Sequence, residues 1–345
     1  MQRPPLTPPE QITNLLNGSW AIQILKSATE LEIFEALKDE ARTADQVAGA
    51  LKYPLKGVAL LLDSLVGMGF LQRLDLANPG KFNAPTFALA EGTGEYLLKE
   101  SPLYMGMYLK QHTELDKMWR GLKDTVQTGK PVMEVNQDAK AEEVFPNLAE
   151  SIIPLNYAIA LDALNVVKAR LGDGPFKVLD VAAGSAVWSI PFAQDHAKTM
   201  VSALDFPAVL AVMERITKRF EVENQYTNLP GNWREVKVVA GSFDVVILGH
   251  ILHSEGLELS RQLLKYCAQA LRPGGILVIA EFFTNREKTA PLHPLMFGLN
   301  MYLATTDGCV FSRGEMTDLC TEAGFGTVVK HSSSDYVSPL HFAIK

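Results

Sequence analysis

The sequence predicts an α/β protein: a doubly wound, mostly parallel sheet closed by a terminal antiparallel hairpin, preceded by a mostly helical winged-helix domain. Three observations predict this fold. The 345 residues exceed the length that one hydrophobic core usually supports. The first part of the chain reads as three helices followed by a β-ribbon. After residue 172, short apolar runs alternate with helical stretches, which is typical of parallel strands joined by crossover helices.

The N-terminal helices are indicated by apolar spacing and by a capping signal. Within Ser19–Leu37, apolar residues recur at three-residue steps and share one helix face: Ile22, Leu25, Ala28, Leu31 and Phe34. Thr43 followed by Gln46 predicts a capping box at the start of a second helix. Tyr53–Gly69 is a third, strongly apolar helix, and the runs Phe70–Arg73 and Lys81–Ala88 form the ribbon. This is the winged-helix order.

The rest of the chain divides at a turn, Gly172–Pro175. Before it, 102–170 is helical in pattern, so we expect a winged-helix domain over 1–101, a helical connector over 102–170 and a sheet domain over 171–345. Buried parallel strands are predicted at Val178–Val181, Val201–Leu204, Val245–Leu248 and Ile276–Ala280. Crossover helices are predicted at Pro191–Ala197, Ala208–Phe220 and Ser260–Leu271.

Two further segments complete the sheet domain. Arg272–Gly275 is predicted as a structural turn between helix and strand. The last two β-like runs, Phe325–Lys330 and Pro339–Ile344, are separated only by a link that contains Ser332–Asp335. So short a link predicts an antiparallel pair, because parallel strands need a crossover connection.

Composition excludes several classes of protein. The net charge is −7 and the basic residues are spread along the chain, which argues against a nucleic-acid partner and favours a small ligand. The three cysteines show no CxxC spacing, as expected in a reducing compartment. The most apolar stretch, Gly57–Leu71, is interrupted by Asp63 and Ser64. We therefore expect a soluble, cytoplasmic protein with neither a membrane nor a nucleic acid as partner.

The first strand of the sheet domain runs into a turn of small residues. Val178–Val181 is followed by Ala182, Ala183 and Gly184, and small side chains let a ligand approach the backbone closely. The turn is not a dinucleotide fingerprint, because Ala186 and Ser189 stand where G-x-G-x-x-G needs glycines. A tight turn without a ligand remains the alternative.

Residues after the next two strands favour a nucleoside. Asp205 ends the second strand, where one carboxylate can accept hydrogen bonds from both hydroxyls of a ribose. After the third strand, Trp233 can stack on adenine and the carbonyl of Asn232 can accept from its amino group. A solvated Asp205 and a Trp233 that only packs are the alternatives.

His253 is the predicted catalytic base. The strand that ends at Leu248 and the strand that ends at Ala280 deliver His253 and Glu281 to the same edge of the sheet, and a histidine oriented by a carboxylate is a general base near neutral pH. The alternative is a histidine that caps the next helix. His250, His253 and Glu255 do not form an H-E-x-x-H motif, so no metal is expected.

In this order the motifs resemble the S-adenosylmethionine-dependent O-methyltransferases of the caffeate, flavonoid and acetylserotonin type, with their bacterial and fungal relatives. The likeness covers nearly the whole chain. Leu179–Ala186 matches the glycine-rich motif, Asp205–Pro207 the acid-x-proline motif and Gly231–Asn232 the Gly-Asp pair. His253 corresponds to the catalytic histidine and Glu281 to the carboxylate that orients it.

The resemblance implies a Rossmann-type methyltransferase domain that binds S-adenosylmethionine, a homodimer formed through the N-terminal domain, and a small acceptor. We expect a planar aromatic or polyketide-like alcohol of the kind found in secondary metabolism. The predicted cofactor contacts are Asp180, Ala182, Gly184, Asp205, Phe206, Asn232, Trp233 and Gly249. The predicted acceptor contacts are Met107, His112, Asn156, Ile159, Asn300 and Met301, for which core or dimer packing is the alternative.

The chain departs from the family pattern at several positions. Plant members carry glycines where Ala182, Ala183 and Ala186 stand, an aspartate at Asn232 and often a lysine at Gly249. Val310 takes the place of a second glutamate beside the histidine. These departures bear on cofactor affinity and on the strength of the base.

Two rival functions remain. A ligand-responsive winged-helix regulator is disfavoured, because the would-be recognition helix, Leu55–Met68, offers only Lys56 as a basic residue and carries Asp63. A relative that methylates carbon or nitrogen, or that acts as a hydroxylase or decarboxylase, is the second. Replacement of His253 by alanine discriminates, since an oxygen methyltransferase loses most turnover and keeps cofactor binding.

Overall fold

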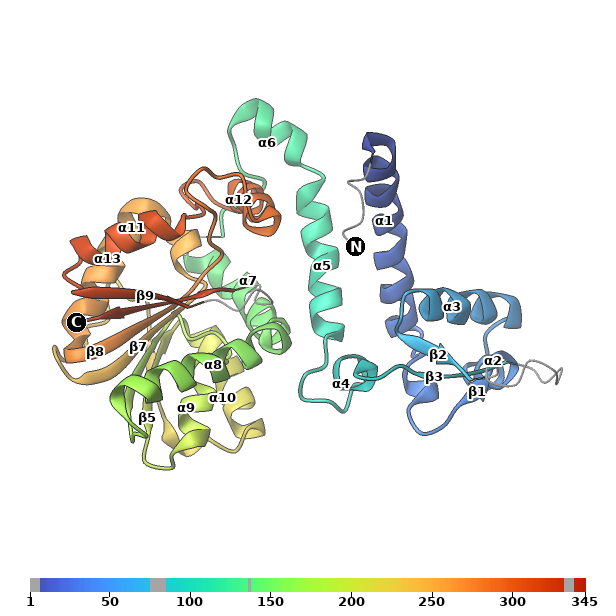
Figure 1. Cartoon of the computed structure of the whole chain (residues 1–345), viewed down its shortest axis with the longest axis horizontal. Helices are drawn as coiled ribbons and strands as arrows, with labels where there is room; N and C mark the ends of the chain where they lie inside the picture. The colour runs from blue at the N-terminus through green and yellow to red at the C-terminus, as the bar shows by residue number, and fades with distance from the viewer. Residues whose placement is uncertain (1–6, 75–84, 136–137, 332–337) are drawn as a thin grey trace. The chain divides into compact units, whose positions relative to one another are not determined.

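A computed structural model describes residues 7–74, 85–135, 138–331 and 338–345 (Figure 1). The chain forms two compact units, Met1–Lys110 and Gln111–Lys345, and the helices predicted as a connector group mainly with the second unit.

The first unit has the predicted winged-helix order. Its main helices are α1 (Pro8–Glu30), α2 (Ala44–Leu51) and α3 (Leu55–Gly67), and a short α4 (Thr93–Leu97) follows. Its sheet has the order β1-β3-β2, with β1 at Arg42–Thr43, β2 at Leu71–Arg73 and β3 at Thr86–Leu89, all pairs antiparallel. The capping box of Thr43 and Gln46 is present. Of the predicted strand Lys81–Ala88, residues 81–84 lie outside the described residues.

The predicted start and end of the first helix are wrong. The helix begins at Pro8 and not at Ser19, because Thr7 and Glu10 form a capping box and proline fits the first turn. It ends at Glu30, after which Glu32 adopts a φ of 60° and the chain turns away before Phe34.

The helices predicted for 102–170 are confirmed. They are α5 (Gly106–Trp119), α6 (Leu122–Thr128), α7 (Asp138–Ser151) and α8 (Ile153–Leu171). Within the described part of the chain no single helix is long and apolar enough to cross a membrane. One bent pair, Ala139–Ser151 with Ile153–Leu171, reaches that length and apolar composition when its two helices are taken together. The cytoplasmic location expected from the sequence stays a prediction.

The second unit contains a seven-stranded sheet in the order β6-β5-β4-β7-β8-β10-β9. Five strands are parallel, and β10 runs antiparallel to both β8 and β9, which confirms the doubly wound sheet and its terminal hairpin. The strands are β4 (Lys177–Val181), β5 (Met200–Asp205), β6 (Tyr226–Pro230), β7 (Phe243–Gly249), β8 (Leu271–Ala280), β9 (Thr327–His331) and β10 (Leu340–Ile344). The link with Ser332–Asp335 lies outside the described residues.

Helices cover both faces of this sheet. They are α8, α9 (Ile190–Asp195), α10 (Pro207–Arg219), α11 (Leu252–Ala270) and α13 (Arg313–Glu322), whereas Leu303 and Ala304 of α12 (Leu292–Ala304) belong to a separate cluster with Met118 and Val135. Alternate strand residues enter different cores: Val178 packs with residues of α8, α9 and α10, whereas Leu179 packs with residues of α11 and α13. Burial on both faces explains why the strands read as continuous apolar runs.

Two predicted boundaries near the site are wrong. Helix α11 begins at Leu252 and not at Ser260, so His253 lies in its first turn, and Gly256 with a φ of 72° kinks the helix there. Arg272–Gly275 is not a turn but the start of β8. Pairing with β7 is irregular over this stretch and Gly274 has a φ of 75°, and the backbone of Lys345 holds it by accepting from Gly274 at 2.8 Å and donating to Gly275 at 3.0 Å.

Candidate active site

The predicted base and its carboxylate meet at the carboxyl edge of the sheet. Gly249 and Ala280 are neighbours in the pairing of β7 with β8, so the residues that follow them lie side by side. His253 Nδ1 lies 2.8 Å from Glu281 Oε2, and the backbone N–H of His253 donates to Glu281 Oε1 at 3.2 Å. Both side chains are buried. The expected convergence of these two residues is confirmed.

Electrostatics set the roles in this pair. Burial raises the pKa of Glu281, but the neighbouring His253 and His250 and the hydrogen bonds from His253 outweigh burial and bring that pKa below its usual value. An ionised carboxylate only accepts hydrogen bonds, so the proton of neutral His253 sits on Nδ1. The lone pair of Nε2 is then free to accept a proton from a ligand.

A second histidine lies beside the pair. His250 Nε2 is 2.8 Å from Ser338 Oγ, and its Nδ1 is 4.0 Å from Glu281 Oε2. One ligand atom from each of His250, His253 and Glu281 lies within 4.8 Å of the others, so the three groups have residue types that can bind a divalent ion. The 2.8 Å separation between His253 and Glu281 is that of a hydrogen bond. The expectation that no metal is bound stays a prediction.

Aromatic rings surround the imidazole of His253. The ring of Phe297 lies edge-on at 4.8 Å and that of Phe282 lies roughly parallel at 5.9 Å, while the two phenylalanines are 4.4 Å apart. His293 is 5.0 Å from Phe282. Phe297 lies within α12. Phe282 directly follows Glu281, but it was not predicted as a residue of the site. Such walls suit a flat, apolar ligand.

The turn of small residues after β4 has the backbone that its composition suggests. Ala182, Gly184 and Ala186 all have positive φ, of 54°, 58° and 63°. Gly184 N–H donates to Asp205 Oδ2 at 2.8 Å and Phe206 N–H donates to Asp205 Oδ1 at 2.7 Å, so this carboxylate ties the turn to the end of β5. Burial raises the pKa of Asp205 to about 6.

Asp180 carries an unpaired oxygen next to this turn. Its Oδ2 accepts from Ser189 Oγ at 2.6 Å, and Ser189 in turn lies 3.1 Å from the hydroxyl of Tyr226. Asp180 Oδ1 is buried without a hydrogen-bond partner among the described residues. Burial raises the pKa of Asp180 to about 8. A cationic group bound here would stabilise the ionised form of the carboxyl.

Two predicted cofactor residues follow β6. Trp233 is 8% exposed and lies 6.1 Å from the ring of Tyr266, so the packing role left open by the sequence is present. Asn232 Oδ1 accepts from the backbone N–H of Arg234 at 3.1 Å and from its Nε at 3.2 Å. Contacts of either residue with adenine stay predictions.

The departure at Gly249 has a steric cause. A Cβ atom at this position would lie 2.1 Å from the indole ring of Trp188, so a lysine could not fit without moving that ring. Trp188 is buried and its ring lies 5.6 Å from that of His250. Trp188 was not predicted as a site residue, because it carries no recognisable signal apart from following the small-residue turn.

The predicted acceptor residues have varied surroundings. Asn300 Oδ1 accepts from Trp119 Nε1 at 2.9 Å, and Asn156 Nδ2 donates to the carbonyl of Ile152 at 3.2 Å. Ile159 and Met301 are buried, while His112 is partly exposed 3.3 Å from Asp116. Met107 belongs to the other unit. The acceptor role of all six residues stays a prediction.

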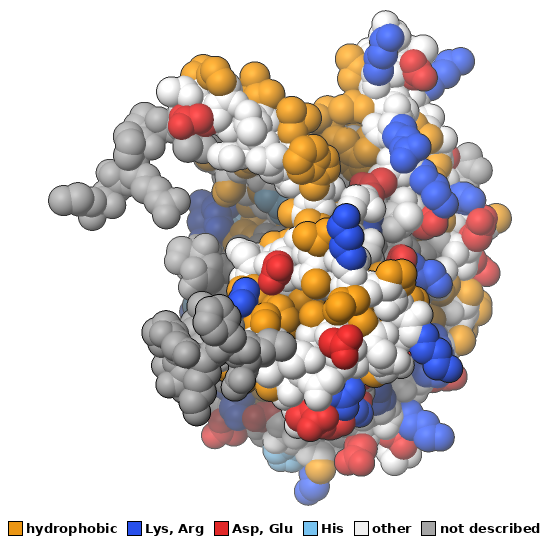
Figure 2. All heavy atoms as spheres, turned by 90° about the vertical axis from the view of Figure 1, so that its right-hand side faces the viewer, with side chains coloured by type: hydrophobic (Ala, Val, Ile, Leu, Met, Phe, Trp, Pro, Cys, Tyr) orange, Lys and Arg blue, Asp and Glu red, His pale blue; other side chains and the backbone are white. Residues whose placement is uncertain are grey.

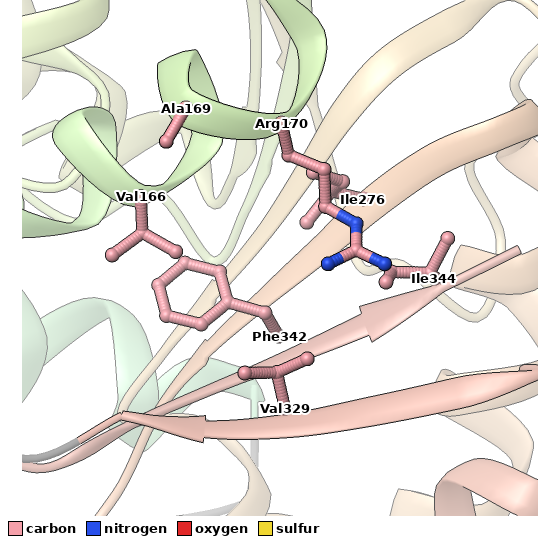
Figure 3. Close-up of a pocket in the computed structure, with 7 residues that line it drawn as sticks. All are labelled: Val166, Ala169, Arg170, Ile276, Val329, Phe342 and Ile344. Atoms are coloured by element: carbon pink, nitrogen blue, oxygen red, sulfur yellow. The ribbon is translucent and has the colours of Figure 1, made fainter.

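A pocket of about 260 Å³ lies away from this edge. Its lining includes Val166 and Arg170 of α8 with Ile276 and Phe342 of the sheet, and Figure 3 shows the Arg170 side chain reaching from α8 toward the strands. Ile276 lies within β8, five residues before Glu281, which follows the end of the strand. None of the predicted site residues lines this pocket.

Comparison with known proteins identifies the family. Residues 119–326 match the O-methyltransferase domain and residues 13–91 match the O-methyltransferase dimerisation domain. Because the first match spans more than half of the chain, the protein belongs to the O-methyltransferase family. This confirms the predicted class of enzyme, an O-methyltransferase.

Individual relatives are distant but span the chain. The 3-hydroxy-5-methyl-1-naphthoate 3-O-methyltransferase of Streptomyces sahachiroi is 24% identical over 93% of this chain and 90% of its own. Acetylserotonin O-methyltransferase of Gallus gallus is 25% identical over 93% of both chains. The solved structure of human N-acetylserotonin methyltransferase in complex with SAM has a TM-score of 0.79, at 20% identity over 100% of this chain and 99% of its own, which shows the shared fold.

Proposed function

We propose that this enzyme methylates a hydroxyl group of a small planar aromatic or polyketide-like acceptor, with His253 as the general base and Glu281 as the residue that orients it. One observation carries this proposal: the hydrogen bond of 2.8 Å between His253 Nδ1 and Glu281 Oε2. This bond leaves Nε2 as the free basic nitrogen, at the edge of a parallel sheet where ligands bind.

The cofactor supplies a methyl group that its sulfonium already activates, so the protein has to align the reactants and remove a proton. His253 Nε2 takes the proton of the acceptor hydroxyl. Glu281 stabilises the imidazolium that results, as carboxylates do in other histidine-based sites. Phe282 and Phe297 exclude water from the imidazole and offer flat surfaces to an aromatic acceptor.

The chain's own residues fit the cofactor at the turn after β4. The unpaired Oδ1 of Asp180 belongs to a buried carboxyl whose ionised form a cationic partner would stabilise, and S-adenosylmethionine offers such a partner. In the turn that follows, Gly184 has no side chain and Ala182 only a methyl group, so a ligand can approach the backbone closely. We assign the remaining contacts as predicted, to Asp205, Phe206, Asn232, Trp233 and Gly249.

The acceptor class rests on the aromatic walls and on the relatives. Besides the naphthoate enzyme, a relative from Streptomyces glaucescens is named as the tetracenomycin polyketide synthesis 8-O-methyltransferase and is 24% identical over 93% of this chain. Another, from Streptomyces rimosus, is named as an N,N-dimethyltransferase and is 25% identical over 94% of this chain. Nitrogen is therefore the second candidate target.

The protein is proposed to act as a homodimer formed through its N-terminal unit, which contains the whole match to the dimerisation domain. Large hydrophobic side chains are exposed on α1, as expected of a face that is covered in the dimer: Ile12, Leu15, Leu16 and Trp20. Figure 2 shows hydrophobic side chains gathered on the upper part of the face that it presents.

The test is methyl transfer from labelled S-adenosylmethionine to a panel of naphthols, polyketide phenols and matched aromatic amines. We expect labelled methyl ethers from the wild type. The variant His253→Ala should bind the cofactor normally in calorimetry and lose turnover by about 10²-fold or more. Labelled amines with no ethers, or full ether formation by the variant, would overturn the proposal.

A further inference from the structure

His250 has a backbone conformation that a histidine does not adopt without cause. It directly follows β7, and its φ is 61°, in the left-handed region where glycine is free and other residues are strained. Its backbone N–H donates to the carbonyl of Ala280 at 3.0 Å, which fixes the position of the residue next to the end of β8. Strained residues persist only where their surroundings hold them, so contacts of the His250 side chain must hold this residue in place.

Those contacts hold the imidazole on several sides. Its Nε2 lies 2.8 Å from the hydroxyl of Ser338, a buried residue just before β10. The ring packs at 4.4 Å against Phe282 and at 5.6 Å against Trp188. The imidazole therefore connects the end of β7 to the start of β10, across the strand that delivers Glu281.

The other ring nitrogen faces the catalytic pair. His250 Nδ1 is 4.0 Å from Glu281 Oε2, the same oxygen that pairs with His253, and it has no hydrogen-bond partner among the described residues. Burial lowers the pKa of His250 to about 4, so its imidazole is neutral and carries one proton. A lone pair on Nδ1 would face a carboxylate and be repelled, whereas an N–H there is attracted. The hydroxyl of Ser338 can donate to Nε2 and so select the tautomer with the proton on Nδ1.

We propose that His250 is a positioning residue: held by Ser338 as the Nδ1–H tautomer, it turns an N–H dipole toward Glu281, keeps that carboxylate ionised and aligned, and thereby sets the basicity of His253. The proposal rests on the proposed function, since it concerns the same base. Among the described residues, His293 of α12 and Cys309 of the loop before α13 are titratable groups that also interact with this cluster.

The first experiment compares His250→Phe with His250→Asn in the pH dependence of kcat/KM. Phenylalanine keeps a ring but offers no N–H, whereas asparagine keeps a donor and tolerates the left-handed backbone. Loss of the dipole leaves more negative potential at His253 and makes it more basic. We expect the phenylalanine variant to lose about tenfold in kcat and its acid limb to move up by about 0.5 to 1 pH unit, with the asparagine variant close to wild type.

A matched control is His331→Phe, which removes another histidine with a carboxylate partner, Asp162 at 2.5 Å, outside the site. Its acid limb should not move. Equal losses in both His250 variants, or a profile for His250→Phe that superimposes on wild type, would show that His250 only packs and would overturn the proposal.

The second experiment does not need an acceptor and so separates this proposal from the proposed function. Spectra of the whole enzyme with ¹⁵N-labelled histidine report the tautomer and pKa of each ring. We expect His250 to be neutral with its proton on Nδ1, to lose that single tautomer in Ser338→Ala, and the pKa of His253 to rise in His250→Phe. A His250 proton on Nε2, or a His253 pKa that is the same in both proteins, overturns the positioning role even if methyl transfer is confirmed.

Discussion

His253 Nδ1 and Glu281 Oε2 lie 2.8 Å apart, in a bond that joins the first turn of α11 to the residue after β8. The same carboxylate accepts from the backbone N–H of His253 at 3.2 Å and, through Oε2, from that of Phe282 at 3.1 Å. Three donors on one buried carboxylate fix its orientation as well as its charge. The imidazole is therefore positioned before any ligand arrives, which is what a general base requires.

Replacement of Glu281 by glutamine should abolish the base while leaving the shape of the site. The amide can donate to Nδ1 and so select the wrong tautomer of His253, with the proton on Nε2. We expect kcat to fall by about 10²- to 10⁴-fold, with little change in the dissociation constant for S-adenosylmethionine. Steady-state kinetics and calorimetry on the same preparation measure both quantities. A variant with near-normal kcat would mean that another group removes the proton.

Binding of the cofactor should release a proton through Asp180. The pKa of this carboxyl is raised to about 8 by burial, so it is largely protonated at neutral pH in the free protein. A bound cation favours the ionised form, and affinity should therefore increase as pH rises toward about 8 and level off above it. Calorimetry in buffers of different ionisation enthalpy measures the released proton.

The control for this titration is Asp180→Asn. Its affinity for S-adenosylmethionine should be lower than that of wild type at pH 8 and should not depend on pH. The stability of the free protein has the opposite pH dependence to the affinity for the cofactor. Because the folded pKa of Asp180 lies above the unfolded one, this carboxyl stabilises the fold at low pH, and its contribution is lost as pH rises through about 8. A wild-type affinity that is flat between pH 6 and 8 would contradict the pairing of Asp180 with a cation.

A β-branched side chain at position 182 should disrupt the turn after β4. Ala182 has a φ of 54°, which alanine tolerates at a cost and which valine strongly disfavours. We expect Ala182→Val to lower the free energy of unfolding by about 2 kcal/mol and to weaken cofactor binding. Ala182→Gly, the residue of plant members, should stay within about 1 kcal/mol of wild type. Denaturant unfolding measures both, and equal stabilities of the two variants would show that the turn is not strained.

Much of the fold and the central pair could be predicted from the sequence, because both depend on local patterns. Strands buried on both faces read as apolar runs, and the carboxyl ends of adjacent parallel strands share an edge, so His253 and Glu281 had to come close. The pairing of His250 with Ser338 could not be predicted, because it joins segments 88 residues apart through a left-handed backbone. The start of β8 was mistaken for a turn for a similar reason, since its partner is the backbone of Lys345.

Charge on the exposed face of α1 should prevent dimerisation. Leu15 is 77% and Trp20 is 69% exposed, and with Ile12 and Leu16 they follow the spacing of one helix face. The double variant Leu15→Asp with Trp20→Asp should be monomeric in light scattering at a concentration where the wild type is dimeric. Val239→Asp, at a site that is 75% exposed in the other unit, is the matched control and should stay dimeric. A dimeric double variant would place the interface elsewhere.

Removal of a buried histidine from β10 should make the fold more resistant to acid. His341 is fully buried and stacks at 4.3 Å on Phe283, with neither ring nitrogen hydrogen-bonded within the described part of the chain. Burial, aided by Arg313 and Lys330, lowers its pKa to about 3. A folded pKa below the unfolded value of about 6.5 means that stability is intact above pH 6.5 and declines as pH falls toward 3.

Phenylalanine keeps the stack on Phe283 and cannot be protonated, so His341→Phe should remove this decline. At pH 5 we expect its free energy of unfolding to exceed that of wild type by about 2 kcal/mol more than it does at pH 8, where His341 is neutral in both states and serves as its own control. Denaturant unfolding at the two pH values measures the difference. If the difference in free energy of unfolding between His341→Phe and wild type is the same at both pH values, protonation of His341 costs the folded protein nothing. That result would contradict the lowered pKa of this buried histidine.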